Sequence, residues 1–262
     1  MKHIPRKRFG QHFLTDQAVI ADIVAAIRPQ ADDAMVEIGP GLGALTAPLA
    51  AVLHHLHVIE IDRDIIARLH KTYAPTRVSV HAGDVLEFDF SVLPRELRVV
   101  GNLPYNISTP LLFHLARYAE RIKDMHFMLQ KEVVERMVAS PGGGDYGRLS
   151  VMLQYRYDME LLLRVAPDAF SPPPQVDSAV VRMRPRPQTQ LTAASPARLE
   201  LVVRHAFAQR RKTLRNSLSG LLDAEHFAAL GIVPGLRAEN LAVADFVAIS
   251  NYLSEKDKST AH

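Results

Sequence analysis

Two spacings of apolar residues alternate along the first 185 residues of the chain. Short apolar runs predict buried strands, and apolar positions three or four residues apart predict helices between them. The predicted strands are residues 34–38, 57–61, 77–81, 98–101, 125–129, 149–157 and 179–184, and the predicted helices are 19–27, 45–53, 63–73 and 131–139. Strands that alternate with helices predict a doubly wound α/β domain, with a parallel sheet covered on both faces.

A second, smaller domain is predicted after a polar, proline-containing stretch. Residues 186–197 carry few large apolar side chains, so we interpret them as a linker between residues 1–185 and 198–262. Beyond the linker every periodic segment has helical spacing, which predicts a small all-helical domain. Its predicted helices are 198–208, 213–222, 225–230 and 243–253, and residues 254–262 are expected to fray.

The composition excludes several classes of protein. Hydrophobic residues make up 48% and charged residues 23% of the 262 positions, which is typical of a soluble protein with a substantial core. No apolar run approaches the ~18 residues of a membrane span, and the basic N-terminus lacks the apolar region of a signal peptide. There is no cysteine, which excludes disulfides, thiolate metal sites and cysteine nucleophiles. We therefore predict a cytoplasmic protein.

Positive charge is concentrated in two segments, although the net charge is only +3. Neither the first ten residues nor residues 206–220 contain an acid. The basic residues of interest are Arg6, Lys7 and Arg8 in the first segment and Arg210, Arg211, Lys212 and Arg215 in the second. Such clusters favour a polyanionic partner such as a nucleic acid, although a solvated charged face explains them equally well.

Acids and glycines follow the first two predicted strands at positions where parallel sheets bind nucleotides. Glu37 begins a glycine-rich turn that contains Gly39 and Gly41, and glycines allow a ligand to approach the backbone closely. Glu60 lies about 20 residues further on, where an acid would bind the hydroxyls of a ribose. The pattern predicts a nucleotide-like ligand; a tight turn without any ligand is the alternative.

The residues after the next two strands are more specific. Asp84 follows the third strand and is suited to accept a hydrogen bond from an adenine amine, and Asn102-Leu-Pro-Tyr105 follows the fourth. This tetrad resembles the catalytic motif of methyltransferases that modify an exocyclic amine of adenosine. The resemblance extends over residues 8–14 (RFGQHFL), 37–41 (EIGPG), 101–108 (GNLPYNIS), 129–132 (LQKE), 146–150 (YGRLS), 170–178 (FSPPPQVDS) and 209–216 (QRRKTLRN).

Together these seven blocks are similar to the small-subunit (16S) ribosomal RNA adenine dimethyltransferases, the kasugamycin-sensitivity family. The resemblance implies a Rossmann-like, S-adenosylmethionine-dependent methyltransferase sheet followed by a small helical domain. It implies an enzyme that dimethylates the N6 amines of two adjacent adenosines near the 3′ end of 16S rRNA, in the 30S subunit or a pre-30S particle, with a role in subunit biogenesis. S-adenosylmethionine is the only cofactor expected. We expect that the protein binds no metal, does not associate with membranes and is a monomer.

The resemblance also implies a role for individual residues. Those expected to bind the cofactor are His12, Leu14, Glu37, Gly39, Gly41, Glu60, Asp84 and Asn102. Those expected to hold the target adenine are Asn102, Leu103, Pro104, Tyr105 and Phe170, with the two aromatic rings stacked on the extruded base. Core packing is the alternative role for Phe170. His12 stands where the family usually has asparagine, which places the polar contact at that position in question.

Three other functions compete with this prediction. The first is a 23S rRNA adenine methyltransferase of the macrolide-resistance type, against which blocks 146–150 and 209–216 argue. The second is an RNA-binding assembly factor without essential catalysis; the intact Asn102 tetrad argues against an inactive protein. The third is a nicotinamide-dependent oxidoreductase, which would explain the glycine turn and Glu60 but leaves the tetrad without a function.

Overall fold

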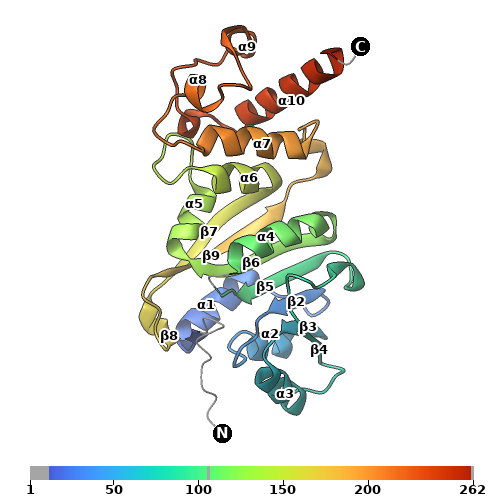
Figure 1. Cartoon of the computed structure of the whole chain (residues 1–262). Helices are drawn as coiled ribbons and strands as arrows, with labels where there is room; N and C mark the ends of the chain where they lie inside the picture. The colour runs from blue at the N-terminus through green and yellow to red at the C-terminus, as the bar shows by residue number, and fades with distance from the viewer. Residues whose placement is uncertain (1–11, 105–106, 261–262) are drawn as a thin grey trace. The chain divides into compact units, whose positions relative to one another are not determined.

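A computed structural model of the chain describes residues 12–104 and 107–260 (Figure 1). The chain forms two compact units. The first contains the described residues up to Val134 together with Met159–Pro185, and the second contains Glu135–Asp158 together with the described residues from Arg186 onward. Residues 135–158 thus belong to the same unit as the C-terminal helices.

The first unit is built on a seven-stranded sheet with the order β4-β3-β2-β5-β6-β9-β7. The strands are β2 (Met35–Ile38), β3 (Leu56–Glu60), β4 (Val78–Ala82), β5 (Leu97–Asn102), β6 (Ile122–Gln130), β7 (Tyr157–Val165) and β9 (Ser178–Pro185). Strands β2 to β6 pair in parallel, whereas β9 runs antiparallel to β6. The sheet is therefore mixed rather than parallel throughout as predicted, because β9 lies beside β6 but runs in the opposite direction.

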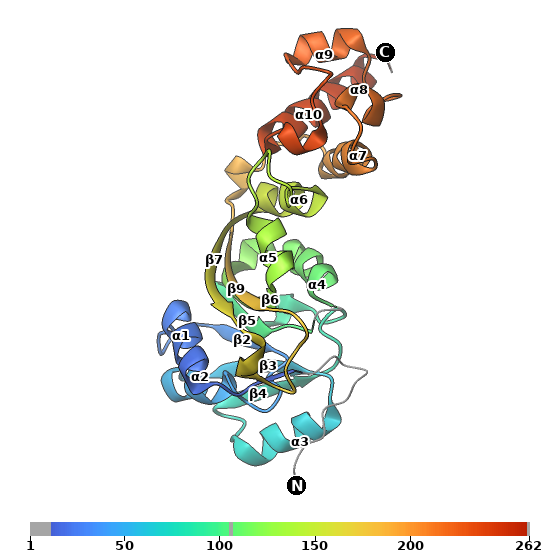
Figure 2. The same ribbon diagram turned by 90° about the vertical axis from the view of Figure 1, so that its left-hand side faces the viewer.

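Helices cover both faces of this sheet. The helices of the unit are α1 (Gln17–Ile27), α2 (Thr46–Val52), α3 (Arg63–Thr72) and α4 (Ser108–Leu115), and α5 (Lys131–Val138) begins directly after β6. Figure 2 shows α1 and α2 on one side of the sheet and α4 on the other. This is the doubly wound, Rossmann-like α/β arrangement that the alternating pattern predicts. Helix α4, which contains Pro110 in its first turn, was not among the predicted helices.

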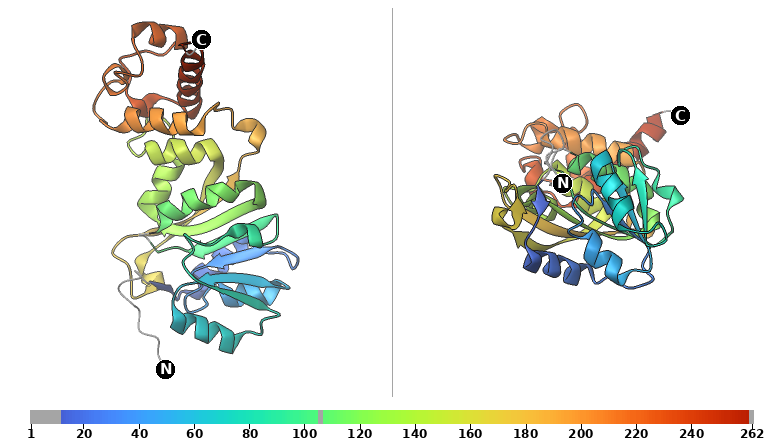
Figure 3. Two further views of the ribbon diagram at one scale, coloured as in Figure 1. Left: turned by 45° about the vertical axis from the view of Figure 1, so that its right-hand side comes forward. Right: turned by 90° about the horizontal axis from the view of Figure 1, so that it is seen from below.

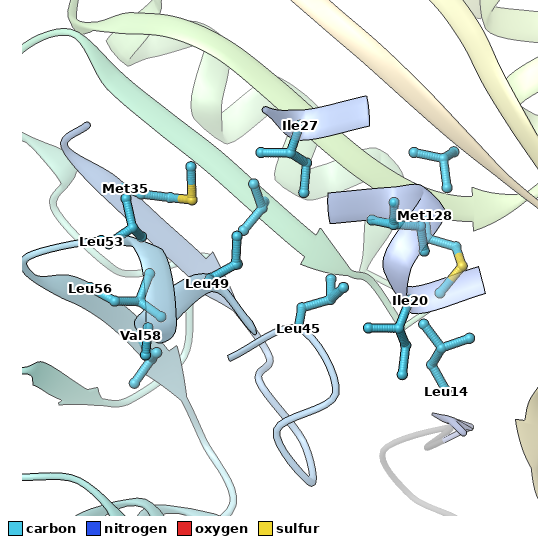
Figure 4. Packing of buried hydrophobic residues seen from close by; sticks show 14 of the residues in the cluster. Leu14, Ile20, Ile27, Met35, Leu45, Leu49, Leu53, Leu56, Val58 and Met128 are labelled. Atoms are coloured by element: carbon cyan, nitrogen blue, oxygen red, sulfur yellow. The ribbon is translucent and has the colours of Figure 1, made fainter. Parts of the chain in front are cut away.

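The core beneath α1, α2 and α3 explains why these segments form where they do. Apolar residues of the three helices form one buried cluster with residues of β2 and β3 and with Met128 of β6. Figure 4 shows part of it, with Ile20 and Ile27 of α1 and Leu49 of α2. Ile20, Ile23 and Ile27 recur at helical spacing on α1 and are all buried. The β2 residues Met35–Ile38 are buried throughout, as expected for a central parallel strand.

A short second sheet joins the two ends of the first unit. Strand β1 (Phe13–Leu14) pairs antiparallel with β8 (Phe170–Ser171), so that Leu14 lies opposite Phe170 and Phe13 opposite Ser171. The backbone N–H of Thr15 also donates to the carbonyl of Ala169 at 2.8 Å. Residues about 155 positions apart are therefore held together by backbone hydrogen bonds. Neither strand was predicted, because two-residue strands carry no hydrophobic period.

The second unit is predominantly helical. Its helices are α6 (Arg148–Arg156), α7 (Pro196–Phe207), α8 (Leu214–Ser217), α9 (Ala224–Leu230) and α10 (Val243–Thr260). Helices α7 and α10 pack against each other (Figure 3), and a cluster of buried side chains that includes Leu199, Phe227 and Phe246 forms the core of the unit. Within the described residues, no helix is long and apolar enough to cross a membrane.

Three sequence predictions about this unit are wrong. Residues 149–157 were predicted as a strand, yet residues 148–156 form α6, with Ser150 accepting a hydrogen bond from the N–H of Gly147 at its start. Because Val151, Met152 and Leu153 are all buried, the segment looked like an apolar strand when it is a helix buried on several sides. The helix predicted at 213–222 is shortened to α8, and α10 continues to Thr260 rather than fraying from 254.

Candidate active site

A cavity of about 290 Å³ lies in the first unit, at the carboxyl ends of β2, β3 and β5. This is the position at which open α/β sheets bind their ligands. The predicted site residues that line it are His12, Leu14, Glu37, Gly39, Gly41, Glu60, Asp84, Asn102, Leu103, Pro104 and Phe170. Tyr105, Arg6, Lys7 and Arg8 lie outside the described residues, so their predicted roles stay predictions.

Two glycines, one lining the cavity and one beside Asn102, occupy positions where a side chain would be crowded. Gly41 has a φ of +54°, and a Cβ atom there would meet the ring of Phe13 at 3.2 Å. At Gly101, which precedes the Asn102 tetrad, a Cβ atom would lie 2.6 Å from the carbonyl oxygen of Ile38. That distance is a steric clash with backbone, so β5 can pass this close to β2 only with glycine at position 101.

Glu37 is the most buried acid of the site, with 2% of its surface exposed. Its carboxylate accepts a hydrogen bond of 2.7 Å from the hydroxyl of Thr46, the first residue of α2. Burial, together with the nearby charge of Glu60, raises the pKa of Glu37 to about 7, although the Thr46 hydrogen bond opposes the shift. Glu37 therefore ties the glycine turn to the helix that follows it and titrates near neutral pH.

Glu60 ends β3 with its carboxylate already oriented by the backbone. Its Oε1 accepts hydrogen bonds of 2.8 Å from the N–H groups of both Ile61 and Asp62. Burial raises the pKa of Glu60, while these backbone N–H groups and that of Gly41 act in the opposite direction. A carboxylate held this rigidly at the cavity wall is suited to accept hydrogen bonds from two neighbouring hydroxyl groups.

Asp84 occupies the loop after β4 and is exposed to solvent. Its Oδ1 accepts a hydrogen bond of 2.9 Å from the N–H of Leu86, and the preceding Gly83 donates its N–H to the carbonyl of Glu60 at 2.9 Å. This second bond holds the loops after β3 and β4 together. It places the two acids on the same cavity, as the parallel order of the strands predicted.

The two polar atoms of the side-chain amide of Asn102, the last residue of β5, have different surroundings. The Nδ2 group donates a hydrogen bond of 3.2 Å to the carbonyl of His12, whereas Oδ1 has no partner among the described residues. The next residue, Leu103, is fixed by its N–H, which donates to the carbonyl of Met128 at 3.1 Å. Asn102 therefore presents an acceptor oxygen at the cavity while one N–H of its amide is bonded to His12.

The β1–β8 pair closes one side of the cavity. His12 has its Nδ1 atom 2.9 Å from the carbonyl oxygen of Pro172, and its own carbonyl accepts from Asn102. The contact to Asn102 is thus made by the His12 backbone, which is independent of the side chain at that position. Phe170 is 5% exposed and belongs to the hydrophobic core as well as to the cavity lining.

Several residues that line this cavity were not predicted as site residues, Phe13 and Ile107 among them. Phe13 lies against Gly41 and Ile107 lies after the Asn102 tetrad; both line the cavity. Both belong to sequence blocks that resemble the family, and that position in the blocks was the signal available. Among the described residues, there is no group of three or more histidine, cysteine, aspartate or glutamate side chains arranged to hold a metal ion.

The predicted basic residues of the C-terminal half lie in the second unit and are exposed. Arg210 has its Nε atom 3.7 Å from a carboxylate oxygen of Glu239, an ion pair that partly offsets its charge. Within the described part of the chain, Arg211, Lys212 and Arg215 have no acidic partner. Three cations around the start of α8 are therefore available to a polyanion.

Comparison with known proteins agrees with this geometry. The profile of the family described as Ribosomal RNA adenine dimethylase matches residues 2–255 of the chain. The chain belongs to the ribosomal RNA adenine dimethylase family. One relative within this family is the Ribosomal RNA small subunit methyltransferase A of Chromobacterium violaceum, which is 65% identical over 256 residues that cover 97% of this chain and 98% of the relative.

Two solved structures of RNA-modifying enzymes also have a fold similar to that of this chain. A dimethyladenosine transferase from Plasmodium falciparum matches with a TM-score of 0.82 and 25% identity, covering 94% of this chain and 98% of that one. The 23S rRNA methyltransferase ErmE matches with a TM-score of 0.71 and 25% identity, covering 92% and 99%. The chain is thus a methyltransferase in sequence family and in fold.

Proposed function

We propose that this chain transfers methyl groups from S-adenosylmethionine to the N6 amines of two adjacent adenosines near the 3′ end of 16S rRNA. The substrate is the 30S subunit or a particle that precedes it, and the role is in small-subunit biogenesis in the cytoplasm. The observation that carries the proposal is Asn102, whose amide donor is occupied by His12 while its acceptor oxygen remains available at the cavity.

The residues present fit S-adenosylmethionine. The glycine turn at Gly39 and Gly41 leaves room for the methionine end of the cofactor, the Glu60 carboxylate suits the two ribose hydroxyls, and Asp84 suits the adenine amine. When bound, the cofactor supplies an electrophilic methyl group on a positively charged sulfur. Because the departing thioether is neutral, no protein acid is needed to assist it.

The chain's own residues then have to orient a poor nucleophile. The lone pair of the adenine amine is delocalised into the ring, and two acceptors on its N–H groups would favour a pyramidal nitrogen. Asn102 Oδ1 is the first acceptor, and a backbone carbonyl of Leu103 or Pro104 is the second. Orientation of this kind contributes ~7–11 kcal/mol in well-positioned reactions. Tyr105 and Phe170 complete the proposal as stacking partners of the extruded base.

The small-subunit assignment is favoured over the 23S-type alternative. The relative from Chromobacterium violaceum, named for the small subunit, is 65% identical over nearly the whole chain, whereas the 23S rRNA methyltransferase ErmE is 25% identical. The exposed cations Arg211, Lys212 and Arg215 supply phosphate contacts for an RNA partner of either kind. A domain division at the linker 186–197 and a monomeric state remain part of the proposal.

One experiment tests the function directly. The protein is incubated with methyl-labelled S-adenosylmethionine and 30S subunits that lack the modification, and the labelled bases are mapped. We expect label on the N6 amines of two neighbouring adenosines near the 3′ end of 16S rRNA. A parallel incubation with 50S subunits is the control for the 23S alternative. Label in 23S rRNA only would refute the small-subunit assignment, and no label in either would refute the enzyme.

A further inference from the structure

A second cavity lies at the amino ends of the parallel strands β5 and β6, whereas the candidate active site lies at the carboxyl ends. It is lined by the end of α1, the beginnings of β5 and β6, and the last residues of β9. Its volume of about 210 Å³ is many times what one water molecule needs. No described residue lines both cavities, so this cavity is separate from the candidate active site.

Positive charge is in excess around this second cavity. The charged residues that line it are the cations Arg28, Arg98, Lys123, Arg182 and Arg184 and the carboxylates Asp33 and Asp124. Arg98 engages both carboxylates, at 2.7 Å from Asp33 and 2.9 Å from Asp124. Five cations against two carboxylates leave a formal excess of three positive charges (5 − 2), and both carboxylates are already bonded to Arg98.

The pairing of the remaining cations confirms this excess. Lys123 lies 3.6 Å from Asp33, which is already bonded to Arg98, and Arg182 pairs with Glu160 on β7. Arg28 and Arg184 are exposed, and neither has an acidic partner among the described residues. Unpaired guanidinium groups at the mouth of a cavity favour an anion, because each can donate charge-assisted hydrogen bonds.

The buried histidine His126 also lines this cavity. Its side chain is 2% exposed, and neither of its ring nitrogens has a hydrogen-bond partner among the described residues. Its Nδ1 atom lies 3.8 Å from Asp124, beyond hydrogen-bond distance. Burial lowers the pKa of His126 to about 4; the guanidinium groups of Arg98, Arg182 and Arg184 lower it too, and Asp124 opposes them. Burying an imidazole without a hydrogen-bond partner costs free energy of folding. A bound polar group at this cavity would supply the partner.

We propose that this cavity is a phosphate-binding site, with Arg184, Arg28 and Lys123 at its mouth and His126 as the polar group beneath them. Phosphate fits better than a halide because its several oxygens can each accept from a different donor. The phosphate is either a free ion or a group of an RNA backbone. The free-ion case is independent of the methyltransferase function, whereas the RNA case rests on it.

The test uses the ring signals of His126 as a local reporter in NMR spectra of the full-length protein. They are assigned by their absence in His126→Gln. Inorganic phosphate is titrated against chloride at constant ionic strength, so that only specific binding moves them. We expect a saturable shift of the His126 signals in the wild-type protein. If the His126 signals respond neither to phosphate nor to RNA, the proposal is wrong and the cavity holds water only.

Two variants separate this site from a general charge effect. In Lys123→Gln/Arg184→Gln we expect the apparent dissociation constant for phosphate to rise about tenfold or more, since two charge-assisted contacts are lost. Arg68→Gln on α3 removes an exposed charge away from the cavity and serves as the matched control, with unchanged affinity. Equal phosphate affinity in the double variant and the wild type would refute the assigned residues.

A final arm identifies the source of the phosphate. A short RNA oligonucleotide is added in place of phosphate and then in competition with it. If RNA reproduces the His126 shift and competes, the site holds a backbone phosphate; if only the free ion acts, it holds a small phosphate compound. Both results support a phosphate site. Failure of the methylation assay would leave the free-phosphate titration unaffected, so the two proposals fail separately.

Discussion

Replacement of Asn102 by alanine is the most direct test of the proposed chemistry. In the structure this change removes one hydrogen bond, the 3.2 Å contact from Nδ2 to the carbonyl of His12. A bond of this kind contributes about 1 kcal/mol to stability, which corresponds to a fall in Tm of roughly 2–4 °C for a protein of this size. Asn102→Ala should therefore fold, and should still bind RNA through Arg211, Lys212 and Arg215.

The expected effect on catalysis is much larger than the effect on stability. Loss of a single preorganised hydrogen-bonding group in an active site lowers the rate by ~100-fold or more, or about 2.7 kcal/mol. Asn102→Asp keeps an acceptor but loses the donor to His12, so its carboxylate would face the His12 carbonyl oxygen. We expect its rate to lie between those of Asn102→Ala and the wild type.

The assay is single-turnover methyl transfer to 30S subunits that lack the modification, with Tm measured on the same preparations. Asn251→Ala is the matched control, because this carboxamide accepts from the N–H of Ala194 and donates to the carbonyl of Thr192, and Asn251 is not a residue of the cavity. The control should lose at least as much stability as Asn102→Ala yet keep its rate. A near wild-type rate for Asn102→Ala would show that the catalytic centre is wrongly assigned.

Three further predictions concern the cofactor, the RNA and pH. Glu60→Ala should raise the calorimetric dissociation constant of S-adenosylmethionine at least ~100-fold, because two charge-assisted hydrogen bonds are lost; an unchanged constant would contradict the proposed ribose contact. Replacement of Arg211, Lys212 and Arg215 by glutamine should flatten the slope of log RNA affinity against log salt by about 2 to 3 units and leave cofactor affinity unchanged; an unchanged slope would assign these residues to a solvated face. The raised pKa of Glu37 means that the folded state binds a proton more tightly than the unfolded state, so this stabilisation is complete below pH 4.5 and is lost as the pH rises through about 7. The unfolding free energy of the wild type relative to Glu37→Gln, measured in urea, should therefore fall by up to roughly 3 kcal/mol over that interval; a pH-independent difference would place the Glu37 pKa near its ordinary value.

The alternation of short apolar runs with helical spacing predicted the doubly wound α/β class and strands β2 to β6, but neither β7 nor the antiparallel direction of β9. Because every helix of such a sheet must bury one face, the spacing of apolar residues indicates the order of helices and strands and so the fold class. The same logic placed Glu37, Glu60, Asp84 and Asn102 at the carboxyl ends of four strands, and the structure brings all four to one cavity. Their individual roles in catalysis and binding stay predictions until the variants are measured.

Tertiary structure alone decided the features that depend on contacts between distant residues. The β1–β8 pair joins residues about 155 positions apart, and two residues cannot show a period of their own. The burial of α6 on several sides hid its helical spacing, so that packing rather than pattern fixed its type. The hydrogen bond from Asn102 to His12, and the lack of a partner for the His126 imidazole among the described residues, both depend on which groups lie opposite these side chains. The period of apolar residues shows which face of a helix or strand is buried, but not which residues pack against that face. In this protein the site depends on those contacts between distant residues.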